Sequence, residues 1–281
     1  MSSAKKIFFR LCPQFMMRPA IAVVNKGREF RGKMETFLFP QKSKLYCPCC
    51  GTKSKSFVAG SYADYPERFN PIRYENTKQD VLCPVCRSLP RHRILASWCD
   101  NHKDLFQKAE DILYFAPEYS MTMWLRRNGV SYKTADLYKE ADLKLDIQAT
   151  GLQDESYDVI ICNHVLEHVD DFRLALNEMF RVLRFGGVFI CSFPMDPKVE
   201  FIEEDPSIQS PEARFCRFGQ DDHKRVFGMK AERFFAKAGF LIEKICGDKY
   251  PENILPVVGP ADYDMNILFC CMKPNDLEGC R

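Results

Sequence analysis

From residue 112 onward, short apolar runs alternate with segments of helical periodicity, and this alternation constrains the fold more than any other feature. The strand candidates are the runs at 112–116, 131–135, 157–162, 188–193, 240–246 and 267–272. Strands separated by helices form parallel sheets, because the chain must cross back over the sheet between them. The last two runs are joined by a loop rich in Pro and Gly, which favours an antiparallel pair. We therefore expect an α/β chain with a Rossmann-like, doubly wound sheet.

Helix boundaries can be read from capping residues between these runs. A helix is expected at 119–128, ending before Gly129. A second is expected to begin after Asp170 and Asp171 and to end at Gly186-Gly187.

Two C-x-x-C pairs precede this pattern. Cys47 and Cys50 form the first pair and Cys83 and Cys86 the second, with 32 residues between the pairs. Two residues between thiolates allow both sulfur atoms to reach one tetrahedral ion, and the second pair completes a four-cysteine site. Gly51 can adopt the left-handed conformation that the first turn needs. The spacing predicts a structural Zn²⁺ ion, with redox pairs or free thiols as the alternative.

The other cysteines indicate the compartment. Of the fourteen cysteines in the chain, Cys162, Cys191, Cys246, Cys270 and Cys271 lie within apolar runs, where a thiol packs as a small hydrophobic group. A secreted disulfide scaffold would be shorter and would begin with a signal peptide. We expect a reducing compartment, the cytoplasm.

Charge is distributed unevenly along the chain, although the net charge is only +2. Residues 1–56 hold eight Lys and four Arg against two Glu, a charge of +10, which leaves −8 for the remainder. Only this basic head is expected to meet a polyanion or a membrane surface. Because Arg10 and Arg18 interrupt its apolar stretch, no transmembrane segment is expected. The arm either packs on its own domain or anchors peripherally through Phe8, Phe9, Phe15, Met16 and Met17.

Polar residues follow the expected strands where a doubly wound sheet binds its ligand. Asp136 lies 20 positions after Ala116, a spacing that suits an acid accepting both ribose hydroxyls of an adenosine. Asp146-Ile147 follows shortly afterwards, and Asn163-His164 ends the next strand.

The block YDVIICNHVLEHVDDFRLALNEMFRVLRFGGVFICSFP at 157–194 resembles class I S-adenosylmethionine (SAM)-dependent methyltransferases of the type 11 group. With CPCCG, CPVCRSLPRHR, ILYFAPE and FGQDDHKRVFG, the chain looks most like a bacterial subgroup that carries a four-cysteine zinc segment before the methyltransferase core. The resemblance implies SAM and Zn²⁺ as cofactors. It also implies three parts: a basic arm at 1–44, a zinc-binding cysteine segment at 45–93 and a methyltransferase domain at 94–281.

The resemblance also implies roles for individual residues. The implied cofactor-binding residues are Phe115, Ala116, Pro117 and Glu118 in the first loop, Asp136 at the ribose, Asp146 and Ile147 beside the adenine, and Asn163 and His164 under the sulfonium. The family's glycine-rich loop is absent, and Ala116-Pro117-Glu118 stands in its place. A dinucleotide needs those amides for its pyrophosphate, whereas the methionine part of SAM carries no phosphate. Glu118 is expected to receive the ammonium group.

The segment His164-Val-Leu-Glu167-His168 also matches the H-x-x-E-H pattern of inverted zinc peptidases. It follows a buried strand, however, and the sequence offers no third ligand at a suitable spacing. We expect His164 to line the cofactor pocket, and Glu167 and His168 to face the acceptor or to cap the helix.

The segment FGQDDHKRVFG at 218–228 is expected to be a polar loop beside the acceptor. The catalytic candidates are His223 or His168 as general base, together with Asp222 and Arg225. The alternative is a loop whose charges only pair with surface acids.

The expected function is O-methylation of a small molecule or a glycan, because the Asn/Asp-Pro-Pro-aromatic motif of amino-group methylators is absent. The first alternative is an RNA-base methyltransferase that binds RNA with the zinc segment and the basic head and stacks bases on Tyr46, Phe57, Tyr62 and Tyr65. The second is a non-catalytic scaffold with a degenerate cofactor loop.

Overall fold

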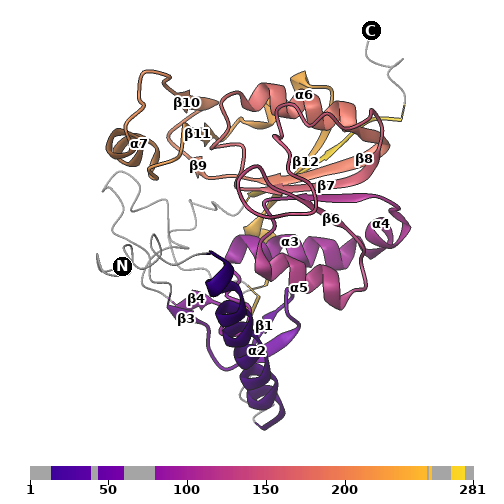
Figure 1. Cartoon of the computed structure of the whole chain (residues 1–281), viewed down its shortest axis with the longest axis vertical. Helices are drawn as coiled ribbons and strands as arrows, with labels where there is room; N and C mark the ends of the chain where they lie inside the picture. The colour runs from indigo at the N-terminus through magenta and orange to yellow at the C-terminus, as the bar shows by residue number, and fades with distance from the viewer. Residues whose placement is uncertain (1–13, 39–43, 60–79, 252, 255–266, 276–281) are drawn as a thin grey trace.

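The structure is a computed structural model of the 281-residue chain that describes residues 14–38, 44–59, 80–251, 253–254 and 267–275 (Figure 1). A six-stranded sheet with strand order β12-β13-β8-β7-β5-β6 lies at its centre. The strands are β5 (Ile112–Phe115), β6 (Lys133–Ala135), β7 (Tyr157–Asn163), β8 (Leu183–Ser192), β12 (Leu241–Cys246) and β13 (Ile267–Met272). β5 to β8 run parallel, and β13 pairs antiparallel with β8 and β12. The expected α/β class and the antiparallel pair are confirmed.

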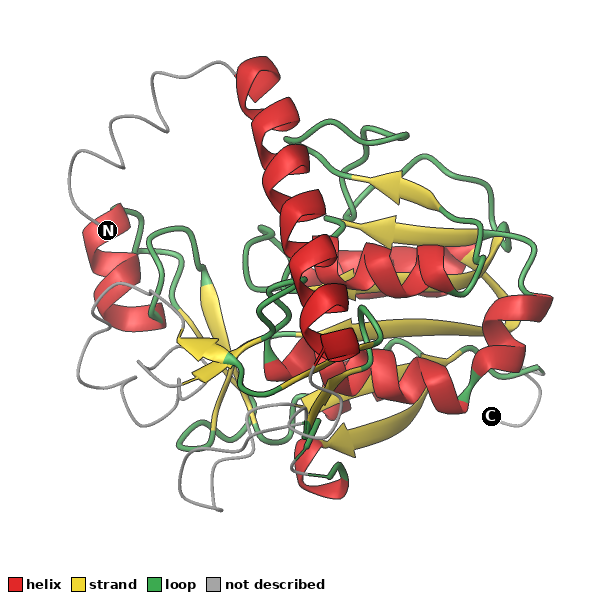
Figure 2. Cartoon of the chain, turned by 90° about the horizontal axis from the view of Figure 1, so that it is seen from below, coloured by secondary structure: helices red, strands yellow, loops and turns green. Residues whose placement is uncertain are grey.

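Helices cover both faces of this sheet, which explains why β5, β7 and β13 are nearly continuous buried runs rather than alternating ones. On one face lie α3 (Pro90–Asn101), α4 (Lys103–Lys108) and α5 (Tyr119–Arg127), as Figures 1 and 2 show. On the other face lie α6 (Phe172–Val182) and α8 (Glu232–Lys237). A short 3-10 helix, η4 (Gly247–Lys249), follows β12.

The start of α6 is as expected, but its end is not. The side chain of Asp171 caps the helix by accepting a hydrogen bond from the backbone N–H of Arg173. The helix ends at Val182, and Gly186-Gly187 lies within β8 instead of closing the helix. The register between β7 and β8 shifts at this point. The glycines therefore shape an irregularity in the sheet, where Gly186 has φ +75°.

A small second sheet, with order β10-β11-β9, follows β8 along the chain. Its elements are β9 (Met195–Asp196), β10 (Ile202–Glu204), α7 (Pro211–Phe218) and β11 (Arg225–Gly228). α7 is capped by Gly219, whose φ of +86° needs a glycine. Of the loop expected at 218–228, only residues 219–224 form a loop, because Arg225–Gly228 pair as the buried strand β11.

The cysteine segment forms two short antiparallel pairs beside α3 (Figure 1). They consist of β1 (Leu45–Cys47) with β2 (Thr52–Ser54), and β3 (Val58–Ala59) with β4 (Asp80–Leu82). Cys47, Ile94 and Tyr114 belong to one buried apolar cluster, so this segment and the large sheet pack together. The expected boundary at residue 93 falls inside α3, and the three-part division stays a prediction.

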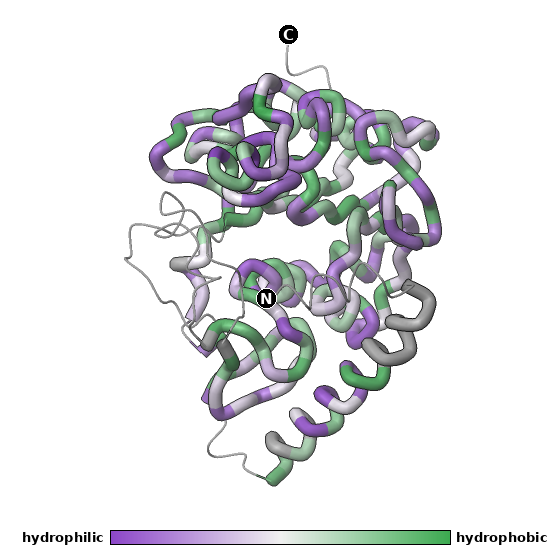
Figure 3. Tube along the Cα trace, turned by 60° about the vertical axis from the view of Figure 1, so that its left-hand side comes forward, coloured by the Kyte–Doolittle hydropathy of each residue, from purple (hydrophilic) through white to green (hydrophobic). Residues whose placement is uncertain are grey.

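The arm contains one long helix, α2 (Gln14–Leu38). It packs on the cysteine segment at Gly32, where a Cβ would come within 2.1 Å of Val85. Tyr119 donates a hydrogen bond of 2.6 Å to Glu29. Figure 3 shows α2 projecting from the body with hydrophobic and hydrophilic segments alternating, and Phe30 and Phe37 are exposed. Among the described helices, none combines the length and apolar character needed to cross a membrane. Of the residues expected to anchor the arm, Phe8 and Phe9 lie outside the described residues, and Phe15, Met16 and Met17 lie in the first turn of α2.

Candidate functional site

A cavity of about 580 Å³ opens at the carboxyl ends of β5, β6 and β7. The chain passes from β5 to β6 and then returns to the other side of β5 to form β7, which makes this a topological switch point. The sequence-predicted residues that line the cavity are Phe115, Ala116, Asp136, Asp146, Ile147, His164, His168 and Asp222. The sheet therefore brings together residues that lie more than 100 positions apart in the sequence.

Two residues at strand ends have a strained backbone, and both line the cavity. Ala116, after β5, has φ +45°, and His164, after β7, has φ +54°. Non-glycine residues rarely adopt this left-handed region, and where they do they often mark functional sites. Both conformations are held by the sheet, since Ala116 N–H donates to the Ala135 carbonyl and His164 N–H to the Ser192 carbonyl, each at 2.8 Å.

Asp136 fixes the loop that follows β6. Its Oδ1 accepts hydrogen bonds from the backbone N–H groups of Tyr138 at 2.8 Å and Lys139 at 2.7 Å. Both bonds use the same oxygen, so the second oxygen of Asp136 is the one available to a ligand. Asp146 fixes the next part of the chain in the same way, because its Oδ1 accepts a hydrogen bond from the backbone N–H of Gln148.

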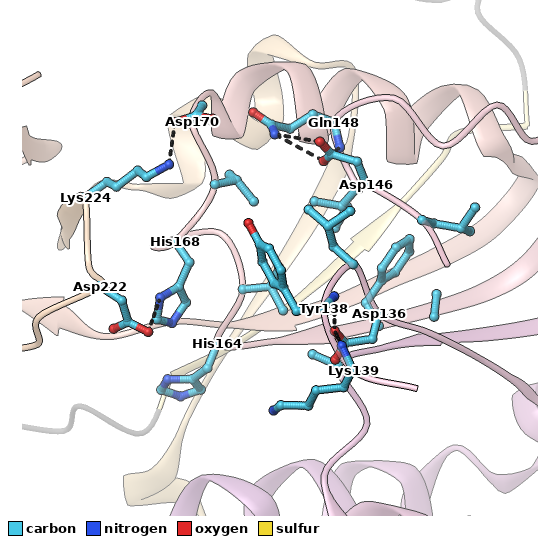
Figure 4. Close-up of a pocket in the computed structure, with 18 of the residues that line it drawn as sticks. Asp136, Tyr138, Lys139, Asp146, Gln148, His164, His168, Asp170, Asp222 and Lys224 are labelled. Atoms are coloured by element: carbon cyan, nitrogen blue, oxygen red, sulfur yellow. Dashed lines mark hydrogen bonds and ion pairs between the residues drawn. The ribbon is translucent and has the colours of Figure 1, made fainter. Parts of the chain in front are cut away.

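Two histidines and an aspartate form the wall of the cavity that lies opposite Asp136. His164, His168 and Asp222 lie together on one side of the view in Figure 4, and Asp136, Tyr138 and Lys139 on the other. Nδ1 of His168 lies 3.4 Å from the carboxylate of Asp222. Asp222 is the sequence neighbour of His223, but the fold pairs its carboxylate with His168, which lies in the turn after β7.

The other two catalytic candidates do not line the cavity. His223 is buried behind His168, with ring centres 4.8 Å apart, and its Nδ1 lies 3.1 Å from the Phe218 carbonyl. The buried guanidinium of Arg225 donates to the backbone carbonyls of Leu166, Val169 and Asp170. Arg225 therefore fastens β11 to the turn at 164–170.

Three predicted cofactor residues, Pro117, Glu118 and Asn163, also do not line the cavity. Oε1 of Glu118 lies 2.6 Å from His92 Nε2 and 3.1 Å from the Arg91 guanidinium. Burial raises the pKa of Glu118, but its contacts with His92 and Arg91 outweigh that effect and hold the pKa well below its usual range. Asn163 accepts a hydrogen bond from Ser192 and thereby joins β7 to β8.

Several lining residues were not singled out from the sequence, namely Tyr138, Lys139, Gln148, Arg214 and Lys224. The first three directly follow predicted residues, so adjacency to Asp136 and Asp146 could have found them. Arg214 and Lys224 come from the insertion after β8, and no local pattern places them at the cavity.

The two C-x-x-C pairs converge on each other. The Sγ atoms of Cys47 and Cys86 lie 3.5 Å apart, and those of Cys50 and Cys83 lie 3.7 Å apart. All four sulfur atoms lie within 4.8 Å of one another. Tetrahedral Zn²⁺ with bonds of about 2.3 Å places its sulfur ligands roughly 3.8 Å apart, so this cluster has the dimensions of a four-cysteine zinc site.

The backbone of the two pairs is also matched. Gly51 N–H donates to the Cys47 carbonyl and Arg87 N–H to the Cys83 carbonyl, at 2.7 and 2.9 Å. Gly51 has φ +72° and Arg87 has φ +61°, so the residue after each pair adopts the left-handed conformation. The expectation for Gly51 is confirmed, and Arg87 meets the same conformational requirement without being a glycine.

Arg93 and Phe57 close the cluster on one side. Arg93 is fully buried and donates to the backbone carbonyls of Val81 and Ser88, beside the thiols. Its guanidinium carbon lies 4.4 Å from the centre of the Phe57 ring. Phe57 is only 1% exposed, so the expectation that it stacks RNA bases is wrong, because Arg93 already covers its face. Tyr62 and Tyr65 lie outside the described residues.

Comparison with known proteins identifies the domain. Residues 100–191, about a third of the chain, match the family described as "Methyltransferase domain". Among solved structures, the chain is similar to a SAM-dependent methyltransferase from Archaeoglobus fulgidus, with 12% identity and a TM-score of 0.42 over 65% of this chain and 94% of that chain. It is also similar to the 1,6-didemethyltoxoflavin-N1-methyltransferase of Burkholderia thailandensis, solved with S-adenosylhomocysteine, with 13% identity and a TM-score of 0.46 over 66% and 79% of the two chains. A search of the curated proteins found no match.

The domain match, which lies within the α/β sheet, indicates a methyltransferase enzyme. The match ends within β8, so it includes the ends of β5, β6 and β7 that form the cavity, but neither the cysteine pairs nor the insertion that carries Asp222 and His223.

Proposed function

We propose that the cavity binds SAM, with the second carboxylate oxygen of Asp136 on the ribose hydroxyls and Asp146 and Ile147 beside the adenine. The methionine part then lies along Phe115 and Ala116. It carries no phosphate, so it does not need the amide-rich turn that a dinucleotide requires. The left-handed backbone of Ala116 supports this assignment, because Ala116 adopts the conformation for which glycine is normally used.

We assign Glu118 to positioning rather than to direct contact with the cofactor. It does not line the cavity, and its Oε1 already meets His92 and Arg91. Glu118 precedes α5 directly, so this clamp holds the loop that leaves β5.

The reaction we propose is O-methylation of a small molecule or a glycan. The acceptor oxygen attacks the methyl carbon in line with the C–S bond, that bond breaks, S-adenosylhomocysteine leaves, and the hydroxyl proton is released. Alignment supplies most of the rate, and activation of the hydroxyl supplies the remainder. We assign that activation to His168, with Asp222 holding its ring.

The position of His168 is the observation that carries this proposal. It lies on the cavity wall with a carboxylate on Nδ1, whereas His223 is buried behind it. The test is transfer of labelled methyl groups from SAM to a panel of hydroxyl acceptors. His168→Ala should lower turnover by about a hundredfold with SAM affinity unchanged. His102→Ala, at the far end of α3, should have no effect. Equal turnover of His168→Ala and the unaltered protein would refute the assignment.

We propose that Cys47, Cys50, Cys83 and Cys86 hold a structural Zn²⁺ ion. The spacing of their sulfur atoms fits the ion, and four cysteine ligands leave no coordination position open for a substrate. The buried guanidinium of Arg93 offsets part of the net negative charge that four thiolates leave on a zinc site. We retain the division into an arm to residue 44, a zinc-binding cysteine segment at 45–93 and a methyltransferase domain from residue 94. A cytoplasmic location is proposed on the cysteines, since none of the twelve in the described residues forms a disulfide bond.

A further inference from the structure

Glu167 is a buried carboxylate without a matching cation. Its side chain is fully buried, and neither of its oxygens has a hydrogen-bond partner of normal geometry. The nitrogens nearest to it are His164 Nδ1 at 3.1 Å and His168 Nε2 at 3.8 Å. In the described part of the chain, no Lys or Arg forms an ion pair with Glu167. Buried charges in proteins are paired with an opposite charge or coordinate a metal ion, and the neighbours here are imidazoles, which are themselves common metal ligands.

Two histidine rings are held in the orientation of metal ligands. Nδ1 of His168 faces the carboxylate of Asp222, and Nδ1 of His223 faces the Phe218 carbonyl at 3.1 Å. An imidazole that donates from Nδ1 to an oxygen carries its free lone pair on Nε2. Metal-bound histidines usually make such a hydrogen bond with the ring nitrogen that does not bind the ion. One ligand atom each from Glu167, His168 and His223 lies within 4.8 Å of the other two.

Long-range contacts hold this group together. The backbone N–H of Lys224 donates to the Glu167 carbonyl at 2.9 Å. The Arg225 guanidinium donates to the carbonyls of Leu166 and Val169, which lie on either side of Glu167 in the chain. His223 thereby becomes the third ligand that spacing alone could not supply to the His164-Val-Leu-Glu167-His168 segment. That segment is a turn after β7, not a helix, so the geometry is unlike that of a zinc peptidase.

We propose that Glu167, His168 and His223 bind a divalent first-row transition-metal ion. Two imidazoles and one carboxylate suit ions such as Mn²⁺, Fe²⁺, Co²⁺ or Zn²⁺ and leave further coordination positions open. His168 and Asp222 line the cavity, so the open coordination positions of the ion face the cavity on the side of these two residues.

The role of this ion rests on the proposed O-methylation, whereas its binding does not. An acceptor hydroxyl bound to the ion has a lower pKa than in water, so its O–H bond breaks with release of the proton to solvent. The oxygen then attacks the methyl carbon as the C–S bond breaks. In this scheme His168 activates the acceptor through the ion that it binds. The best acceptors carry a hydroxyl group beside a second oxygen, because the two oxygens can occupy two open coordination positions of the ion.

Manganese binding tests the site, because Mn²⁺ prefers oxygen and nitrogen ligands and does not compete for the four-cysteine cluster. We would titrate full-length protein that carries one equivalent of zinc, enough for the four-cysteine cluster alone, with Mn²⁺ and follow the loss of the free-ion signal by electron paramagnetic resonance. The expected result is one ion per chain. Both Glu167→Gln, which keeps the shape, and His168→Ala, which changes a partly exposed ring, should weaken binding by about tenfold or more. The control His102→Ala should bind as the unaltered protein does.

The outcomes separate this inference from the proposed function. No saturable Mn²⁺ binding at millimolar concentration would overturn the metal site, as would equal affinity in Glu167→Gln and His168→Ala. SAM affinity, measured by calorimetry on the same samples, tests the cofactor site independently and also reports whether each variant is folded.

Discussion

His92 and Glu118 join the cysteine segment to the loop that leaves β5 at the edge of the cavity. Leu89 N–H donates to His92 Nδ1 at 2.9 Å, so the ring proton is on Nε2 and points to the Glu118 carboxylate 2.6 Å away. On the other side, Sγ of Cys49 donates to the His92 carbonyl at 3.3 Å. A continuous chain of contacts therefore runs from Cys49, between the two cysteines of the first pair, through α3 to the loop that leaves β5.

Replacing His92 should weaken SAM binding without removing any cavity residue. In His92→Ala, the partly buried Glu118 loses its closest partner, and the loop at 116–118 loses the contact that holds it. We expect a roughly tenfold lower SAM affinity by calorimetry and a free energy of unfolding lower by about 1–3 kcal/mol. His102→Ala, in which the lost ring stacks on Trp98 near the end of the same helix, serves as the control. Unchanged SAM affinity in His92→Ala would show that the clamp does not position the loop.

Loss of one cysteine ligand should remove zinc and destabilise the protein. Elemental analysis of the purified protein should give one zinc per chain, and Cys83→Ser should give well below one. Thermal unfolding of Cys83→Ser should occur at a lower temperature, because the ion contributes directly to folding. Cys216→Ser changes an exposed cysteine outside the cluster and should alter neither result. A full zinc content in Cys83→Ser would argue against the four-cysteine assignment.

Glu178 should make stability depend on pH below neutrality. Its hydrogen bond with Arg181 and those from Thr150 hold the pKa of Glu178 at about 2, below an unfolded value of about 4.3. The folded state is thus favoured above about pH 4.3, and this contribution is lost as the pH falls towards 2. We expect Glu178→Gln to lower the free energy of unfolding by about 1–2 kcal/mol at pH 7, because solvent screens part of the pair. In urea titrations the difference should shrink at pH 3; a constant difference at both pH values would contradict this origin.

Gly187 should not tolerate a side chain. A Cβ there would lie 2.8 Å from the Arg184 carbonyl oxygen and 2.9 Å from that of Asp158, and neither backbone atom can move freely. Gly187→Ala should lower the free energy of unfolding by about 1–3 kcal/mol in urea titrations. Gly27→Ala, on α2 with open space around the new methyl group, should be neutral or slightly stabilising. A neutral Gly187→Ala would mean that the β7–β8 irregularity is not tightly packed.

Local patterns predicted the parts of this molecule that local chemistry determines. The apolar runs gave β5, β7 and β8 because strands buried on both faces have no polar alternation. The cysteine spacing predicted which sulfurs meet, because two residues between thiols fix the turn. Asp136 was found by its distance from β5, which reflects the length of one strand–helix–strand unit.

The remaining features depend on contacts between distant segments. Gly186-Gly187 resembles a helix stop, but a register shift against β7 uses it within a strand. Asp222 stands beside His223 in the sequence, yet the turn after β7 brings His168 to its carboxylate. Arg225 resembles a catalytic cation, but three carbonyls of that turn take its guanidinium. Phe57 is aromatic and follows a basic stretch, but Arg93 covers it. None of these pairings has a local sequence signature.

SAM binding tests the central claim most directly. Titrating SAM into the full-length protein in a calorimeter should show one site of micromolar affinity. Asp136→Ala should abolish that binding, while Asp142→Ala, which removes a nearby aspartate that does not line the cavity, should retain it. No heat of binding from the unaltered protein at millimolar SAM, or equal affinity in Asp136→Ala, would contradict the account.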